Sequence, residues 1–359
     1  MNLEDCCEIL DSMRIPITES DREEGKYPYY GANGIQDYVA DYIFDDELVL
    51  LAEDGGNFGS KEKPIAYRVS GKCWVNNHAH VLKPKASLNV DYLCYSLMFY
   101  KVEGMINGAT RQKLTQAAMR KMKIPLRSMK EQVYIVEQLN YINQIKTQRQ
   151  RELKLLENLI RARFVEMFGD PVLNEKGWKI VTVGDIVTEV RYGTSKPAVE
   201  GGKYPYLRMN NLTADGHLDL KDLKYIDISE DEIEKCVVRK GDVLFNRTNS
   251  IELVGKTAVF DLTEEMVIAG YIIRVRLTKE MLPVVFSQYM NLEPLKVILR
   301  GMAKGAVNQA NINAQELQSI KVYIPDMKLQ NQFADFVQQI DKSKLQYHPH
   351  THTCQPNTS

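Results

Sequence analysis

Seam positions between 135 and 160 recur at alternating spacings of four and three, and they are apolar except for Lys146 and Arg149, which is the pattern of a helix with one apolar stripe and two cationic interruptions. No Gly or Pro occurs from Leu126 to Phe168, and Gly169-Asp170-Pro171 then supplies a helix stop. A helix over residues 131–168 would be about 57 Å long, so we expect a spacer that packs against a partner helix; the alternative is a long core helix inside one domain. The expected seam consists of Ile135, Leu139, Ile142, Leu153, Leu156 and Ile160.

A second segment without Gly or Pro begins at Asp326, and its apolar residues again fit one helix face. This helical pattern fades after Lys344 into a His-rich end that includes His348, His350, His352 and Cys354. The spacing of these side chains could suit a metal. A segment without a surrounding core has no fixed ligand geometry, however, so we expect a disordered tail without a metal function.

Short blocks of sequence occur twice, in the same order. Lys26-Tyr27-Pro28-Tyr29 returns at 203–206, Gly108-Ala109-Thr110-Arg111-Gln112 returns in altered form at 305–309, and Ile124-Pro125 with Gln132 returns as Ile324-Pro325 with Gln332. Short β-type runs cluster between turns rather than alternating with helices, which favours two α+β domains, each followed by a helix. The expected boundaries are 1–127 for the first domain, 128–170 for the first helix, 171–325 for the second domain, 326–344 for a shorter second helix and 345–359 for the tail.

Composition and charge narrow the class of protein. The 359 residues are 44% apolar and 26% charged, without a run long enough to span a membrane and without a visible signal peptide, so we expect a cytoplasmic protein. Six cysteines without pairing rhythm are expected to be reduced thiols. The net charge of −1 hides an uneven distribution, because residues 1–54 hold 3 basic and 15 acidic side chains whereas residues 55–130 hold 14 basic and 3 acidic ones. A local basic face can bind phosphate whatever the total charge, although a solvated surface would also explain it.

The sequence carries no convincing catalytic motif. Gly255-Lys256-Thr257 resembles the end of a phosphate-binding loop, but Ser250 stands where the first Gly of that loop is needed, so a strand is the better interpretation. The glycines at 55–59 lack dinucleotide-binding spacing. His78 and His80 would share one face of a strand and could approach a ligand, although we expect polar residues on the wet or DNA-facing side of a sheet. We therefore predict a chain that is not an enzyme and binds no cofactor itself.

Polar loops rich in Arg, Asn, Gln and Tyr recur at matching places in the two repeats. Arg, Asn and Gln side chains can read guanine and adenine edges bidentately, and Lys and Thr suit phosphates. Such loops are often only turns, but their recurrence favours a recognition surface on each domain. The candidate DNA-binding residues are Tyr29, Tyr30, Asn33, Lys61, Arg111, Gln112, Arg208, Asn210, Asn211, Arg247, Thr248, Asn249, Asn308 and Gln309.

The sequence resembles the specificity subunit of type I restriction–modification systems. The resemblance rests on the two Tyr-Pro-Tyr segments, on Gly-Asp-Val-Leu-Phe-Asn-Arg-Thr at 241–248, and on the Ile-Pro pairs that precede the two helices. It implies an α+β fold with two tandem target-recognition domains separated by long coiled-coil spacer helices. Each domain would read one half of a split site in double-stranded DNA.

The resemblance also implies partners. Two modification subunits would bring S-adenosylmethionine and methylate adenine, restriction subunits would add ATP- and Mg-dependent translocation and cleavage, and the specificity subunit itself would do no chemistry. The second spacer helix is shorter here than is usual in that family. A truncated or silent allele that acts only as a helical dimerisation adaptor is therefore the alternative hypothesis.

Overall fold

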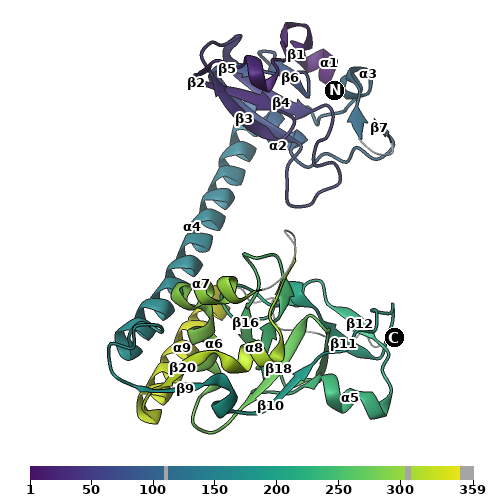
Figure 1. The fold of residues 1–359 in the computed structure, drawn as a ribbon. Helices are drawn as coiled ribbons and strands as arrows, with labels where there is room; N and C mark the ends of the chain where they lie inside the picture. Colours follow the sequence, from purple (N-terminus) through teal and green to yellow (C-terminus); the bar gives the residue numbers. More distant parts are fainter. Residues whose placement is uncertain (109–111, 304–308, 348–359) are drawn as a thin grey trace. The chain divides into compact units, whose positions relative to one another are not determined.

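The computed structural model describes residues 1–108, 112–303 and 309–347, with side chains up to Lys344 at the end of the chain. It divides into two compact units, Met1–Thr147 and Gln148–Ser359. The division falls inside the long helix α4 (Met129–Phe168), so each unit contains one end of this helix (Figure 1). The long helix expected from the apolar periodicity is confirmed, with 40 residues. The domain boundaries given above stay predictions.

A six-stranded sheet in the order β1-β6-β4-β5-β2-β3 organises the first unit. Its central strand reads Leu48-Val49-Leu50-Leu51, and all four side chains are fully buried. Leu48 and Leu50 pack in one apolar cluster and Val49 and Leu51 in another, because successive side chains point to opposite faces. The strands are β1 (Cys7–Ile9), β2 (Glu24–Gly31), β3 (Gly34–Val39), β4 (Phe44–Ala52), β5 (Ala66–Val75) and β6 (Ala79–Pro84), with a separate pair β7 (Ile106–Asn107) and β8 (Lys113–Leu114).

The helical segments of the first unit before α4 are short, and α2 packs against β4, β5 and β6 of the sheet. The side chain of Asn89 accepts hydrogen bonds from two amides of the first turn of α2, which is the usual role of Asn before a helix. Beyond α3, the Ser128 hydroxyl and the Glu131 carboxylate each accept from the other's backbone amide, a capping box that starts α4. The helical segments are α1 (Leu3–Cys6), η1 (Asp11–Met13), η2 (Glu19–Asp21), α2 (Val90–Leu97) and α3 (Gln116–Arg120).

Two four-stranded sheets form the second unit, in the orders β10-β18-β14-β16 and β12-β11-β17-β13. Two-stranded pairs β15-β19 and β20-β9 complete it. The strands are β9 (Lys179–Thr182), β10 (Val187–Tyr192), β11 (Tyr204–Leu207), β12 (Lys224–Ile226), β13 (Val237–Val238), β14 (Val243–Asn246), β15 (Thr248–Asn249), β16 (Thr257–Val259), β17 (Met266–Ile268), β18 (Ile272–Leu277), β19 (Ala310–Asn311) and β20 (Lys321–Ile324). The helical segments are η3 (Val183–Ile186), η4 (Met209–Asn211), α5 (Glu230–Cys236), α6 (Pro283–Asn291), α7 (Glu293–Met302), α8 (Ala314–Ser319) and α9 (Met327–Tyr347).

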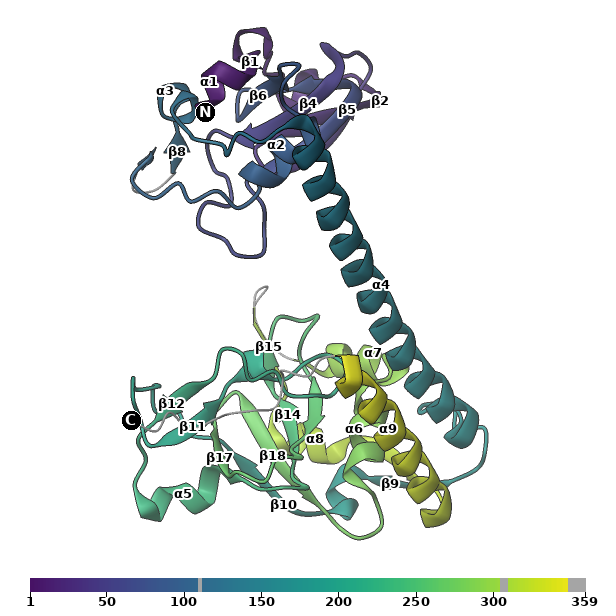
Figure 2. The ribbon, with the colours of Figure 1, turned by 180° about the vertical axis from the view of Figure 1, so that it is seen from behind.

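The end of α4 is built into the core of the second unit. Phe164 lies 5.4 Å from Phe333 of α9, ring centre to ring centre, in an edge-to-face contact. Figure 2 shows α9 beside this end of α4. The last carbonyl groups of a helix have no partner within it. Here Trp178 donates its indole N–H to the carbonyl oxygen of Phe168, and the Tyr323 hydroxyl donates to that of Gly169. Gly169 adopts a φ of +83°, the conformation that ends many helices at glycine.

Candidate nucleic-acid interface

The two domains share one scaffold. In each, the second Tyr of the Tyr-Pro-Tyr segment is buried, and its hydroxyl bonds backbone twelve residues upstream: Tyr29 at Ile17, and Tyr206 at Thr194. The same strand also pairs in parallel in both domains, with Tyr29 opposite Trp74 and Tyr206 opposite Val267. Tyr29, a candidate contact from sequence, therefore anchors an upstream loop here.

A buried glutamine ties each long helix to its domain. Gln132 accepts from the amide of Asn89 at 2.8 Å and donates to the carbonyl oxygens of Ser87 and Arg127. In the second domain Gln330 makes the equivalent set of bonds to Leu282, Glu280 and Pro325. The sequence pairing of Gln132 with Gln332 was wrong: Gln332 is exposed, and the spacing after the Ile-Pro pair is two residues shorter in the second copy.

In the first domain, two of the candidate DNA contacts meet at one glycine. Asn33 is exposed and donates to the carbonyl oxygen of Gly55 at 2.9 Å, and the amide of Gly55 donates to the carbonyl oxygen of Gln112. Tyr30 is half-buried against Tyr67. Lys61 is exposed in the loop that follows. Arg111 lies outside the described residues.

In the second domain the polar candidates are held by their own neighbours. Arg208 pairs with Asp222 at 2.8 Å, and the buried Asn211 donates to the carbonyl oxygen of Asp219. Asn210 is exposed. The Arg208 amide also donates to Oδ1 of Asn211 and closes the η4 turn, and of these three candidates Asn210 alone is exposed.

The Asn-Arg-Thr-Asn segment at the end of β14 is held by bonds within the segment and by bonds to neighbouring segments. Asn249 donates to the side-chain oxygen of the fully buried Asn246, which in turn donates to the carbonyl oxygen of Thr248. Thr248 is buried and Asn249 half-buried, and Arg247 lies 4.8 Å above the ring of Tyr192. Gln309 is exposed, and Asn308 lies outside the described residues.

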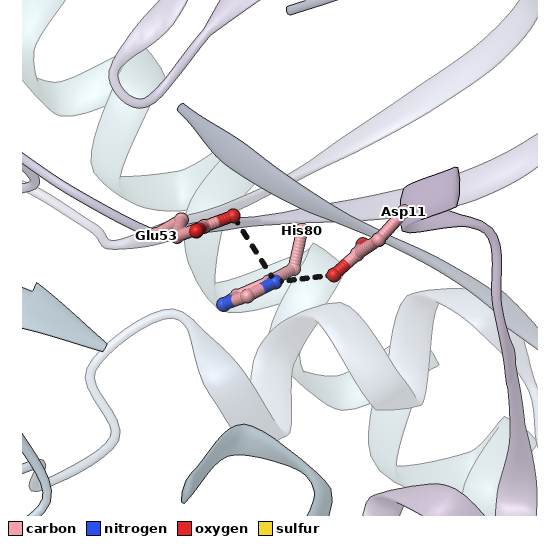
Figure 3. A group of neighbouring side chains, drawn as sticks. All are labelled: Asp11, Glu53 and His80. Carbon is pink, nitrogen blue, oxygen red and sulfur yellow. Dashed lines mark hydrogen bonds and ion pairs between the residues drawn. The ribbon is translucent and has the colours of Figure 1, made fainter. Parts of the chain in front are cut away.

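A buried charged cluster in the first domain was missed by sequence reasoning. Figure 3 shows His80 between two carboxylates: Nδ1 lies 2.7 Å from Asp11 and 3.6 Å from Glu53. The expectation that His80 lies on the wet face of the sheet was wrong, because its side chain is fully buried. His78 lies just before β6 and pairs with Asp54 at 2.6 Å. The sequence signal for these buried acids would have been their basic partners, Arg14 and Lys113, which lie far apart in the sequence.

The cluster has the residue types of a metal site, but cations of the chain already occupy it. Arg14 lies 2.6 Å from Glu53, and Lys113 lies 3.0 Å from the other oxygen of the same carboxylate. Burial acts to raise the pKa of Asp11, but hydrogen bonds from His80 and Gln116 outweigh it and lower the pKa below its ordinary value. An additional divalent cation would face Arg14 and Lys113, so the residues do not fit one.

Lys256 and the described cysteines are buried within the domains. The amine of Lys256, in the segment that resembles a phosphate-binding loop, donates to the carbonyl oxygens of Met209 and Leu212, and burial lowers its pKa. The strand interpretation holds only for Thr257, which begins β16; Gly255 lies in the preceding turn with a φ of +78°, and Lys256 lies between the turn and the strand. The five cysteines of the described part are buried and free; Cys354 and the His-rich tail lie outside it.

The seam of α4 is covered unevenly. Ile135 and Leu139 are half-buried in the first unit, Leu153 and Leu156 are half-buried in the second, and Ile160 is 2% exposed. Ile142, between them, is 58% exposed. Within the described residues, no helix combines the length and apolar character needed to cross a membrane.

Comparisons with known proteins agree with this architecture. The model of the type I restriction modification DNA specificity domain matches residues 1–155 and 175–350. A putative type I restriction enzyme specificity subunit from Haemophilus influenzae is 27% identical over 348 residues, covering 94% of this chain and 86% of that protein. The EcoKI specificity subunit from Escherichia coli is 25% identical over 314 residues, covering 82% and 68%. The crystal structure of an S subunit from M. genitalium, 14% identical, superposes with a TM-score of 0.55 over 98% of this chain and 91% of that one, which supports the fold. Since the family model matches both repeats and most of the chain, the chain belongs to the type I restriction modification DNA specificity family.

Proposed function

We propose that this chain is the non-catalytic specificity subunit of a type I restriction–modification complex and reads a two-part target in double-stranded DNA. The observation that carries the proposal is the repeated scaffold: two domains with equivalent buried anchors present different polar side chains. Two domains of the same scaffold with different polar surfaces can each bind one of two different DNA half-sites. No finding favours a silent allele over this function.

The partners follow from the same proposal. Two modification subunits supply S-adenosylmethionine and methylate adenine, and restriction subunits use ATP and Mg for translocation and cleavage. The long helix α4 supports such an assembly, because its seam is exposed at Ile142 and apolar side chains at this spacing pack against other helices. The DNA-contact residues predicted from sequence belong to this proposal, and the exposed ones among the described residues are Asn33, Lys61, Gln112, Asn210 and Gln309.

The test is co-expression of the chain with the modification subunit from its own genome, followed by S-adenosylmethionine-dependent methylation of a random-sequence DNA library. The expected product is one split methylated motif. An Asn210→Ala variant should then relax the base preference in one half only. A complex that assembles but methylates DNA without sequence preference would refute the proposal.

A further inference from the structure

The two repeats have the same residue types at their buried anchors, Tyr29 and Tyr206, and Gln132 and Gln330. Other positions make the same backbone hydrogen bonds in both repeats but carry different side chains. Such a position follows the inner strand of each domain. The amide of Glu53, after β4, donates to the carbonyl oxygen of His78 at 2.9 Å, and the amide of Arg247, after β14, donates to that of Tyr271 at 2.9 Å. Residues 53 and 247 are therefore structural equivalents.

A later segment of each domain, residues 113–114 in the first and 311–312 in the second, pairs with these positions in the same register. The amide of Leu114 donates to the carbonyl oxygen of Glu53 at 2.7 Å, and the amide of Ile312 donates to that of Arg247 at 2.9 Å. The residue before each is thus also equivalent. Lys113 forms a bridge with Asp54 in the first domain, as Asn311 pairs with Thr248 in the second.

In both domains the side chain that follows β4 or β14, Glu53 or Arg247, bonds to the side chain of the second equivalent residue, Lys113 or Asn311. Glu53, 9% exposed and bonded to Arg14, accepts from the amine of Lys113 at 3.0 Å. Arg247 stacks on Tyr192 and donates from Nη2 to Oδ1 of Asn311 at 2.9 Å. A carboxylate fixes an ammonium in one domain, and a guanidinium fixes a carboxamide in the other.

The two held side chains both carry hydrogen-bond donors. The side chain of Lys113 is 49% exposed and can only donate hydrogen bonds. Asn311 is half-buried, its Oδ1 accepts from Arg247, and its Nδ2 amide carries two hydrogens that it can donate to a ligand. Base edges that accept hydrogen bonds in the major groove are guanine N7 and O6, adenine N7 and thymine O4.

We propose that Lys113 and Asn311 are equivalent base-reading donors, one for each half-site, and that Glu53 and Arg247 are the positioning residues that aim them. The proposal rests on the DNA-reading function above. It assigns each donor to acceptor atoms of a base rather than to the amino groups of cytosine or adenine. Phosphate contacts carry no sequence information. If residues 113 and 311 contacted only phosphates, their side chains would not need to differ between the two repeats.

The decisive variant is Asn311→Asp in the complex with the modification subunit. Aspartate keeps an oxygen for Arg247 but replaces the Nδ2 donor with a second acceptor. We expect methylation of the original motif to fall about tenfold or more, with a changed base preference at one pair of the second half-site and an unchanged first half-site. Asn331→Asp, which places the same charge on an exposed position of α9, is the matched control and should leave the motif unchanged.

Three further variants keep the proposal testable if Asn311→Asp does not fold. Lys113→Gln should alter one base pair of the first half-site only, with Lys101→Gln, also exposed, as its control. Arg247→Ala should broaden preference at the base pair that Asn311 reads, and Arg247→Lys, which keeps a donor for Asn311, should restore it in part.

The outcomes separate the proposal from the function beneath it. Failure of the unaltered complex to methylate a defined motif would count against the proposed function itself. The other case is an unaltered complex that methylates a defined motif. If Asn311→Asp and Lys113→Gln then lower methylation equally on all DNA sequences, both residues are phosphate contacts and the proposal is overturned. Unchanged motifs in both variants would overturn it as well.

Discussion

Gln330 offers a direct test of how the second domain is joined to its helix. The side chain is fully buried and makes three hydrogen bonds at 2.9 Å, one from the Leu282 amide and two to the carbonyl oxygens of Glu280 and Pro325. Gln330→Leu removes all three without a large change of volume. At about 1 kcal/mol for each net hydrogen bond, the free energy of unfolding of the second unit should fall by about 3 kcal/mol.

The chain provides its own reporter for this measurement. It has two tryptophans, and Trp178 lies in the second unit, so in a Trp74→Phe background the fluorescence follows that unit alone. The urea midpoint should fall by about 1 M or more for Gln330→Leu. Gln332→Leu, at an exposed position of the same helix, should change the free energy by less than about 0.5 kcal/mol. Equal losses from the two variants would refute the assignment of Gln330 as the equivalent of Gln132.

Three other expectations can be checked in the same way. Phe333→Ala should cost the second unit about 3 to 5 kcal/mol by leaving a cavity beside Phe164, with faster amide exchange in α9; unchanged exchange would show that this contact does not hold the helix. Because the pKa of Asp11 is lowered in the folded chain, its contribution to stability is present above the ordinary value of 3.8 and is lost as the pH falls further; Asp11→Asn should flatten that part of the unfolding curve against pH, and an identical curve would contradict the bond to His80. Burial first of all lowers the pKa of Lys296 to about 7, so stability should rise with pH between 7 and 10.5; Lys296→Met should abolish this rise in urea titrations, and its persistence would place the titration elsewhere.

The sequence by itself determined the elements whose signal is local or periodic. The long helix follows from apolar spacing and from the absence of Gly and Pro before Gly169, and the structure has it over Met129–Phe168. The twofold order of domains follows from repeated blocks, and the family model matches both copies. The α+β class follows from short strands between turns.

Only the tertiary structure decided which polar residues are free. Thr248 and Asn249 are candidate contacts in the sequence, but Thr248 is buried and Asn249 donates to the buried Asn246. His80 is buried because Asp11 and Glu53, distant in the chain, meet it there. The equivalence of Lys113 and Asn311 is likewise invisible without the backbone bonds that define their register. Periodicity reports how one segment folds, whereas burial and pairing depend on which distant segments the fold brings against it.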